Sequence, residues 1–184
     1  MKKIMFSDKF CLTQAVLSGI KTMTRRVLRG NVPLGNWEET AKHLPYKVGD
    51  IVAIAQPYKD IIECLPMYSD TILDEVGMPR KEFKAGWTNK MFVKADLMKH
   101  HIKITDVKVE RIQSISVDDI LCEGVWQFYD NKNLFYVSKN IGYAPDVAFL
   151  SAREAFWYLI DNISGKGTWE SNPWVAAYRF EFID

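Results

Sequence analysis

Cysteine is scarce in this sequence and does not occur in closely spaced pairs. The chain of 184 residues contains three cysteines, Cys11, Cys64 and Cys122, which are an odd number and stand far apart. Because there is no C-x-x-C pair, we expect neither a disulfide framework nor a zinc knuckle. Reduced thiols in a cytoplasmic protein are the simplest interpretation of this pattern.

The sequence also lacks an excess of charge of either sign and has no long apolar run. Its 24 Lys and Arg residues nearly balance its 23 Asp and Glu residues, so no overall field draws the protein onto nucleic acid or a membrane. No stretch approaches the roughly 18 apolar residues of a membrane span. The first residues, MKKIMFSDKF, contain no apolar run long enough for a signal peptide. We expect a cytoplasmic protein with no membrane partner, which binds its ligands through local patches.

The motifs of common cofactor and metal sites are missing. The Gly-Lys-Gly of "SGKGTW" does not have the spacing of a Walker phosphate-binding loop. His100 and His101 are adjacent, would face opposite ways in a strand, and have no obvious third ligand. There is no nucleophile elbow to support a catalytic triad. We therefore expect neither a cofactor nor a metal.

Local patterns predict a mixture of helices and strands. Helices are expected where apolar residues recur at helical spacing after a capping residue, and strands where apolar and polar residues alternate. Residues 30–49 contain three Gly and two Pro and are interpreted mainly as loop. The expected helices are 8–18, 116–123 and 146–163, and the expected strands are 51–55, 91–95, 101–113 and 173–184. Ser116 and Asp119 form a capping pair at the start of the second helix and Gly124 ends it, while Phe156 lies on the buried face of the third.

The alternation in the strand at 101–113 slips by one residue at Thr105-Asp106. Such a slip indicates a bulge or bend of the kind that curls a sheet into a barrel. Strands without regular βα alternation, mixed with a few helices, favour an α+β fold around a small bent β-barrel. The length fits a single domain, 1–184, in which the weakly patterned residues 57–90 form an insertion or lid.

The stretch "KTMTRR" places Lys21, Thr24, Arg25 and Arg26 directly after a helix that ends at Gly19. Cations there suit the negative end of a helix dipole, so a solvated turn is one interpretation and a phosphate clamp is another. A third is a catalytic centre, which requires Lys21 and Thr24 to converge. In a flat strand they would point to opposite faces, so they meet only if the backbone turns between them.

Glu123 is the second candidate for chemistry. It is expected in the last turn of the helix at 116–123, where the negative end of the dipole disfavours a carboxylate unless a cation neutralises it. A carboxylate in this position suits a general acid or base. The alternative is an ordinary surface Glu that pairs with a nearby Lys.

Four segments resemble ASCH-domain proteins, especially the long forms common in phages and prophages. They are "SGIKTMTRR", "YKVGDIV", "ITDVKVERIQSISVDDILCEGV" and "ISGKGTWESNPWVAAYRFEF", and they run in order along the chain except for residues 57–90. The resemblance implies a PUA-like fold, a small bent β-barrel with helices around it. Short bacterial members of the family are amidohydrolases that remove the acetyl group from acetylated cytidine. Their proposed catalytic Lys, Thr and Glu fall here on Lys21, Thr24 and Glu123, and Arg26 also matches.

This chain departs from the long forms at two places. Their Arg-Glu pair after the "GD" strand is replaced by Ala55 and Gln56, and their Pro-Arg by Lys94 and Ala95. These departures leave the Lys-Thr-Glu set intact but alter any shared substrate contact.

The resemblance implies an amidohydrolase acting on an N-acylated pyrimidine nucleoside or a similar small amide. The alternative is a non-catalytic module that binds RNA or a modified base, as PUA-like domains often do, and a third is an accessory protein that binds a protein partner through residues 57–90. A flat base would need an aromatic wall, for which Trp174 is the first candidate, although core packing is the other interpretation of that residue. The expected substrate-binding residues are Arg25, Arg26, Lys94 and Trp174.

Overall fold

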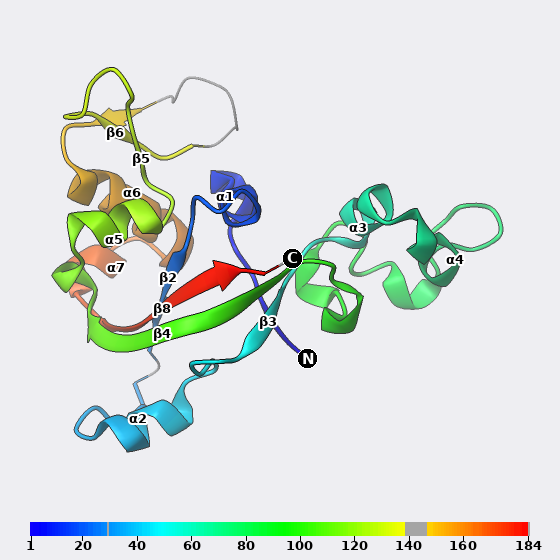
Figure 1. The fold of residues 1–184 in the computed structure, drawn as a ribbon, viewed down its shortest axis with the longest axis horizontal. Helices are drawn as coiled ribbons and strands as arrows, with labels where there is room; N and C mark the ends of the chain where they lie inside the picture. Colours follow the sequence, from blue (N-terminus) through cyan, green and yellow to red (C-terminus); the bar gives the residue numbers. More distant parts are fainter. Residues whose placement is uncertain (29, 139–146, 184) are drawn as a thin grey trace. The chain divides into compact units, whose positions relative to one another are not determined.

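The computed structural model describes residues 1–28, 30–138 and 147–183. It has a mixed α+β architecture with a five-stranded sheet in the order β1-β3-β4-β8-β2 and a three-stranded sheet in the order β5-β6-β7 (Figure 1). The expected α+β class is therefore confirmed. Among the described residues no pairing joins β1 to β2, the two ends of the larger sheet, so that sheet does not close into a barrel. No helix within the described ranges is long and apolar enough to cross a membrane.

The chain divides into two compact units. Unit 1 consists mainly of Met1–Phe6 and Ile51–Ile102, and unit 2 of Ser7–Asp50 and Lys103–Phe182. The strand β4 (His101–Arg111) begins in the first and continues into the second.

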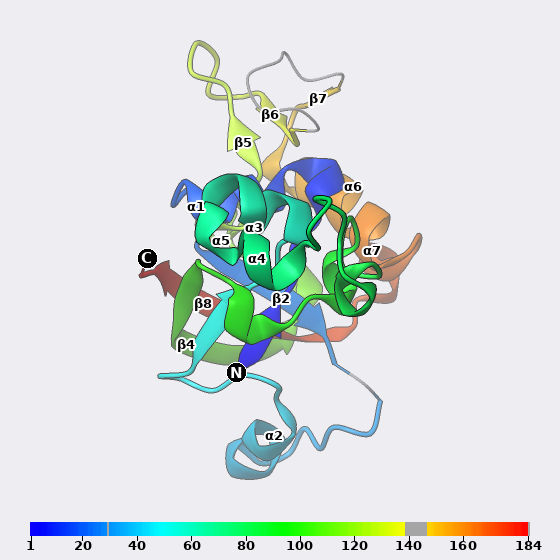
Figure 2. The same ribbon diagram turned by 90° about the vertical axis from the view of Figure 1, so that its right-hand side faces the viewer.

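In unit 1 the strands β1 (Lys2–Ile4) and β3 (Ile51–Ile54) pair in parallel. The rest of the unit is built from two short helices and several single 3-10 turns (Figure 2). The helices are α3 (Tyr58–Cys64) and α4 (Ser69–Ile72), and the turns are η2 (Pro66–Tyr68), η3 (Lys81–Phe83), η4 (Lys90–Phe92) and η5 (Ala95–Leu97).

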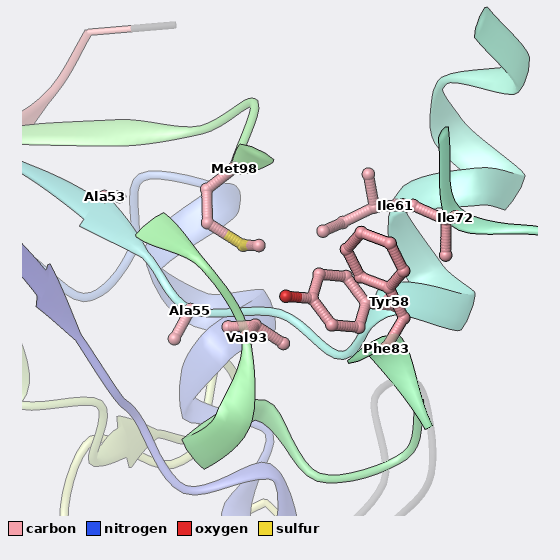
Figure 3. Close-up of a cluster of buried hydrophobic side chains, with 8 residues drawn as sticks. All are labelled: Ala53, Ala55, Tyr58, Ile61, Ile72, Phe83, Val93 and Met98. Carbon is pink, nitrogen blue, oxygen red and sulfur yellow. The ribbon is translucent and has the colours of Figure 1, made fainter. Parts of the chain in front are cut away.

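Unit 1 has a hydrophobic core of its own, centred on Tyr58. The Tyr58 and Phe83 rings meet edge to face, with centroids 5.0 Å apart, and Figure 3 shows them between Ile61 and Ile72 on one side and Val93 on the other. Residues from the predicted insertion at 57–90 thus supply much of this core. The buried cluster consists of Ala53, Ala55, Tyr58, Ile61, Ile72, Phe83, Val93 and Met98.

The strand predicted at 91–95 is wrong. The segment forms the 3-10 turns η4 and η5 instead, and the Asn89 side chain caps the first of them by accepting a hydrogen bond from the Met91 N–H at 3.0 Å. Val93 is buried through this turn geometry, so an apolar run that resembles a strand is used here as a folded loop.

In unit 2 the strands β2 (Met23–Val27) and β8 (Trp174–Phe182) pair antiparallel. The helix α5 (Val117–Cys122) packs against β2 and against α6 (Ala152–Ser164), and α6 also contacts α7 (Thr168–Ser171) (Figures 1 and 2). The remaining elements of the unit are η1 (Asp8–Phe10), α1 (Leu12–Leu17), α2 (Trp37–His43), η6 (Ile112–Ser114), β5 (Trp126–Gln127), β6 (Phe135–Tyr136) and β7 (Ala148–Phe149).

Two predicted boundaries in unit 2 need correction. The helix expected from residue 146 begins at Ala152, because the Ser151 hydroxyl caps it and β7 occupies residues just before it; residue 146 itself lies outside the described ranges. The loop expected at 30–49 contains α2. The Asn36 side chain caps this helix by accepting a hydrogen bond from the Glu38 N–H at 2.8 Å, a local signal that outweighs the surrounding Gly and Pro.

The helix predicted at 8–18 is divided at Cys11, which has a φ of 52°, into η1 and the shorter α1. Other predicted elements agree better with the structure. The strand β4 covers 101–111 and shows two successive exposed residues, Thr105 and Asp106, where the phase slips. The helix α5 begins after Ser116 and is followed by Gly124, as predicted. The buried face of α6 includes Phe156, which is 1% exposed.

Candidate active site

The backbone brings Lys21 close to the end of α5 in unit 2. After α1 the chain turns at Gly19, which has a φ of 73°, and the N–H groups of Ile20 and Lys21 both donate to the Ala15 carbonyl at 2.9 Å. The next residue, Thr22, donates its N–H to the Cys122 carbonyl at 3.0 Å. The expected chain reversal at Gly19 is therefore present, and it fixes the start of β2 beside the last turn of α5.

Glu123 caps the C-terminus of α5 and is followed by Gly124, which has a φ of 97°. That conformation favours glycine, and space requires it as well. A Cβ at Gly124 would lie 2.8 Å from Cδ2 of Leu12 and 3.6 Å from Cδ of Lys21. Gly124 thus lets the Lys21 stem pass close to the backbone on its way to Glu123.

Lys21 and Glu123 form a buried ion pair. The Lys21 Nζ donates to Glu123 Oε2 at 2.7 Å and to the Glu123 backbone carbonyl, also at 2.7 Å. The two side chains are only 1% and 6% exposed. Burial lowers the pKa of the Lys21 ammonium below its usual value; the charge of Glu123 opposes this effect, while the charges of Arg26 and Arg25 add to it.

Arg25 is the second cation on Glu123. Its Nη1 donates to Glu123 Oε1 at 3.1 Å, so each oxygen of that carboxylate is held by a different cation. Its Nε and Nη2 donate to Glu110 Oε1 at 2.9 and 2.6 Å, and Nη2 also donates to Asp119 Oδ2 at 2.8 Å. The Arg25 side chain is 0% exposed and is enclosed by three carboxylates.

Two further cations complete this cluster on its outer side. Lys108 lies 2.8 Å from Asp119 Oδ2 and 3.3 Å from Glu110 Oε2, and Arg179 donates to Asp119 Oδ1 at 3.1 Å. Burial by itself would raise the pKa of the Asp119 carboxyl, but the hydrogen bonds and charges of Lys108 and Arg25 outweigh it and lower that pKa. The ion cluster, as we call it below, consists of Lys21, Arg25, Lys108, Glu110, Asp119, Glu123 and Arg179.

Sequence reasoning did not identify four members of the ion cluster. Lys108 and Glu110 alternate on one face of β4, which could have pointed to a charged strip facing a partner. Asp119 appeared only as a partner of the Ser116 cap, and indeed its N–H donates to the Ser116 hydroxyl at 3.1 Å. Nothing in the local sequence of Arg179 indicates its contact with Asp119, which lies 60 residues away.

Thr24 lies on the other face of β2. The register pairs Thr24 with Tyr178, and Arg25 with Ala177, so successive side chains of β2 alternate between the two faces. The face of Arg25 carries the ion cluster, and Thr24 shares its face with Tyr178. Among the described residues, the Thr24 hydroxyl makes no hydrogen bond to Lys21 or Glu123. The structure thus brings together two of the three predicted catalytic residues.

Arg26 is half-buried on the same face as Thr24. Its charge acts on two tyrosines, Tyr46 and Tyr178, whose rings meet edge to face with centroids 5.3 Å apart. Burial raises the pKa of Tyr178 to about 12. The Tyr178 hydroxyl is buried and has no hydrogen-bond partner within the described part of the chain.

The two remaining predicted substrate residues, Trp174 and Lys94, belong to different units. Trp174, at the start of β8, is half-buried and stacks under the Arg111 guanidinium, which lies 4.6 Å from the ring centroid. Lys94 belongs to unit 1, where its ammonium lies 4.8 Å from the centre of the Phe83 ring and its N–H donates to the Tyr58 hydroxyl at 2.7 Å. Within the residues that the structure describes, no group of His, Cys, Asp and Glu is arranged to hold a metal ion.

The chemistry of the ion cluster follows from these contacts. The Lys21 ammonium and the Glu123 carboxylate are at hydrogen-bond distance, so a proton can pass between them. The guanidinium of Arg25 keeps its charge at all relevant pH values and stabilises the ionised form of Glu123. A carboxylate in contact with a lysine of lowered pKa is an arrangement that can accept and return a proton.

No known protein family matches the chain, and no curated protein matches it. Two solved structures align with most of its length. One is a protein of family DUF984 from Enterococcus faecalis, with 14% identity and a TM-score of 0.38, covering 94% of this chain and 67% of the other. The second is an ASCH domain from Lactobacillus crispatus, with 12% identity and a TM-score of 0.37, covering 96% of this chain and 75% of the other. The resemblance to ASCH proteins therefore comes from the four sequence segments.

Proposed function

We propose that the protein is an amidohydrolase acting on an N-acylated pyrimidine nucleoside or a similar small amide. The observation that carries the proposal is the buried pair of Lys21 and Glu123, whose charged atoms lie 2.7 Å apart although the residues are 102 positions apart in the chain. The resemblance to ASCH proteins supports the same two residues. In this proposal residues 1–184 act as one PUA-like domain of the long phage type in the cytoplasm, and residues 57–90 are its insertion or lid.

Amide hydrolysis needs a base to activate water, an acid for the leaving nitrogen and a donor for the oxyanion. In the proposed reaction Glu123, assisted by Lys21, takes a proton from water as the water oxygen bonds to the acyl carbon. The C–N bond then breaks, its electron pair goes to the nitrogen, and the same proton is delivered there. The products are a carboxylic acid and a free amine, and no cofactor is consumed.

The roles of Thr24 and Arg26 remain part of the proposal. A Thr24 ester intermediate would require the hydroxyl to reach the acyl group and Lys21 together. Because the register gives Thr24 the opposite face of β2 from Arg25, it supports direct attack by water over a Thr24 ester. Arg26 cannot act as a base and shares the face of Thr24, but its charge acts on Lys21, so its proposed role is that of a nearby positive charge that helps to orient the substrate.

A second candidate function is the binding of RNA or a modified base without turnover. The stacked pair of Arg111 and Trp174 favours it, because a half-buried indole beside a guanidinium is a surface on which bases stack. The two functions differ in their salt dependence. Binding of a strand through phosphates weakens steeply as salt rises, whereas binding of an uncharged nucleoside changes little.

The test is incubation of the purified protein with a panel of acylated nucleosides and simple amides, read by chromatography. We expect loss of the acyl group from at least one N-acylated pyrimidine nucleoside, and no loss with Lys21→Met or Glu123→Gln. The matched control is Lys42→Ala, which removes an exposed Lys–Glu pair of nearly the same length, 2.6 Å, and should leave turnover unchanged. Turnover that survives Glu123→Gln would contradict the proposal, as would a panel with no substrate at all.

A further inference from the structure

Four of the five N–H groups of Arg25 are already used within the ion cluster. Its Nε, Nη1 and Nη2 atoms all donate to carboxylates within the ion cluster, and its side chain is 0% exposed. These contacts do not suit the substrate-binding role expected from the sequence. They suit a residue that acts on another side chain, and the side chain in question is Glu123.

The two cations on Glu123 differ in one respect. Lys21 can lose its proton, because it is buried and its pKa is lowered, whereas the guanidinium of Arg25 cannot. If Lys21 were the only cation, Glu123 would be a lone buried charge whenever Lys21 became neutral, and a lone buried carboxylate takes up a proton or moves. With Nη1 of Arg25 at 3.1 Å from Oε1, the carboxylate keeps a counter-charge and a fixed direction.

We infer that Arg25 is a positioning residue, which keeps Glu123 ionised and in one orientation while Lys21 gives up and regains a proton. This inference rests on the proposed function, because it concerns the same site. Glu110 and Asp119 contribute to this positioning, since they accept hydrogen bonds from the other donors of Arg25 and so fix the direction of the guanidinium. A lysine in place of Arg25 would carry the charge but could not span three carboxylates from one planar group.

The charged groups around Lys21 set the sign of the expected effects. Glu123 favours its charged form, and Arg25 and Arg26 disfavour it. Beyond Arg25 lie Glu110 and Asp119, and beyond these lie Lys108 and Arg179. Removing the charge of Arg25 should therefore raise the pKa of Lys21, and removing the charge of Glu110 should lower it.

The experiment is an NMR titration of the full chain labelled at lysine Cε, with the Lys21 signal identified by its loss in Lys21→Met. Arg25→Gln should move the Lys21 titration to higher pH, and Glu110→Gln should move it to lower pH. Lys42→Gln, which removes an exposed cation, is the control and should leave it unchanged. The Glu110 side chain is 17% exposed in the native protein. If Arg25→Gln does not fold, Glu110→Gln therefore still tests whether the Lys21 titration shifts in the expected direction.

Activity supplies the second measurement. In Arg25→Lys the Lys21 titration should lie close to that of the unaltered protein. Turnover should still be lost, because lysine lacks the planar fork that directs Glu123. A Lys21 titration that is unmoved in both Arg25→Gln and Glu110→Gln would overturn the inference whether or not a substrate is known. Shifts of the expected sign in a protein that hydrolyses no panel member would support the inference and refute the amidohydrolase instead.

Discussion

The buried pair of Lys21 and Glu123 predicts which of two substitutions lowers the free energy of unfolding more. In Glu123→Gln, the Lys21 ammonium loses its charged partner in a site where its side chain is 1% exposed. Leaving one partner of a buried ion pair without its counter-charge costs about 3–5 kcal/mol of unfolding free energy. In Lys21→Met, by contrast, Glu123 keeps the hydrogen bond from Arg25 at 3.1 Å, so the loss is that of charge-assisted hydrogen bonds, about 1.5–3 kcal/mol. Glu123→Gln should thus be the more damaging substitution.

The assay is urea denaturation at neutral pH, with the free energy of unfolding obtained by linear extrapolation and the slope checked for constancy. Because the two residues share one interaction, the double variant Lys21→Met with Glu123→Gln should lose less than the sum of the single losses. The exposed pair of Lys42 and Glu39 is the control, and Lys42→Ala should cost no more than about 1 kcal/mol. A loss under about 1 kcal/mol for Glu123→Gln, or a larger loss for Lys21→Met, would refute the buried geometry.

Three further predictions concern the surroundings of the site. Phe156→Ala should lower the unfolding free energy by about 3–5 kcal/mol in urea melts, since the ring is 1% exposed, whereas Ile163→Ala on the same helix, at 38% exposed, should cost far less; equal losses would mean that the buried face is misplaced. Gly124→Ala should cost roughly 1–3 kcal/mol in the same assay because of its positive φ and its approach to Leu12, and an unchanged midpoint would contradict this. The pKa of Asp119 is lowered in the folded state, so its ionised form stabilises the protein above the ordinary pKa of 3.8, and this contribution is lost as the pH falls through the folded-state pKa. In thermal melts, Asp119→Asn should therefore reduce the fall in melting temperature at acid pH. An unchanged fall would argue against the ion cluster.

Part of this architecture could be predicted from local pattern. The helix α5 was predicted because Ser116 and Gly124 mark its ends, and α6 was predicted through the spacing of residues such as Phe156. The turn at Gly19 was predicted for the same reason, since a helix needs a residue that tolerates positive φ at its end. Such signals are local in the chain, so a single sequence contains them.

Other features could not be predicted because they depend on distant partners. The burial of Val93 in a 3-10 turn depends on the core around Tyr58, and an isolated apolar run does not distinguish that from a strand. The contacts of Asp119 with Arg25 and Arg179 span 94 and 60 positions, and no local pattern indicates them.

The candidate site contains features that the sequence predicts and features that it does not. The resemblance to ASCH proteins nominated Lys21 and Glu123, which the structure brings together. The position of Thr24 followed from the alternation of strand side chains, which was the reason to doubt convergence in a flat strand. The burial of Arg25 could not be predicted, because a cation in an exposed turn and a cation among buried carboxylates look the same in sequence.

The most direct test of the central claim is the rate of acetyl release from an N-acetylated cytidine nucleoside by the unaltered protein and by Glu123→Gln, measured at saturating substrate with Lys42→Ala as the control. The account predicts measurable release by the unaltered protein and by Lys42→Ala. It predicts a loss of at least about a hundredfold in Glu123→Gln, the scale of a missing general acid–base group. Equal rates for the unaltered protein and Glu123→Gln, or release by neither, would contradict the claim that the Lys21–Glu123 pair is a hydrolytic centre.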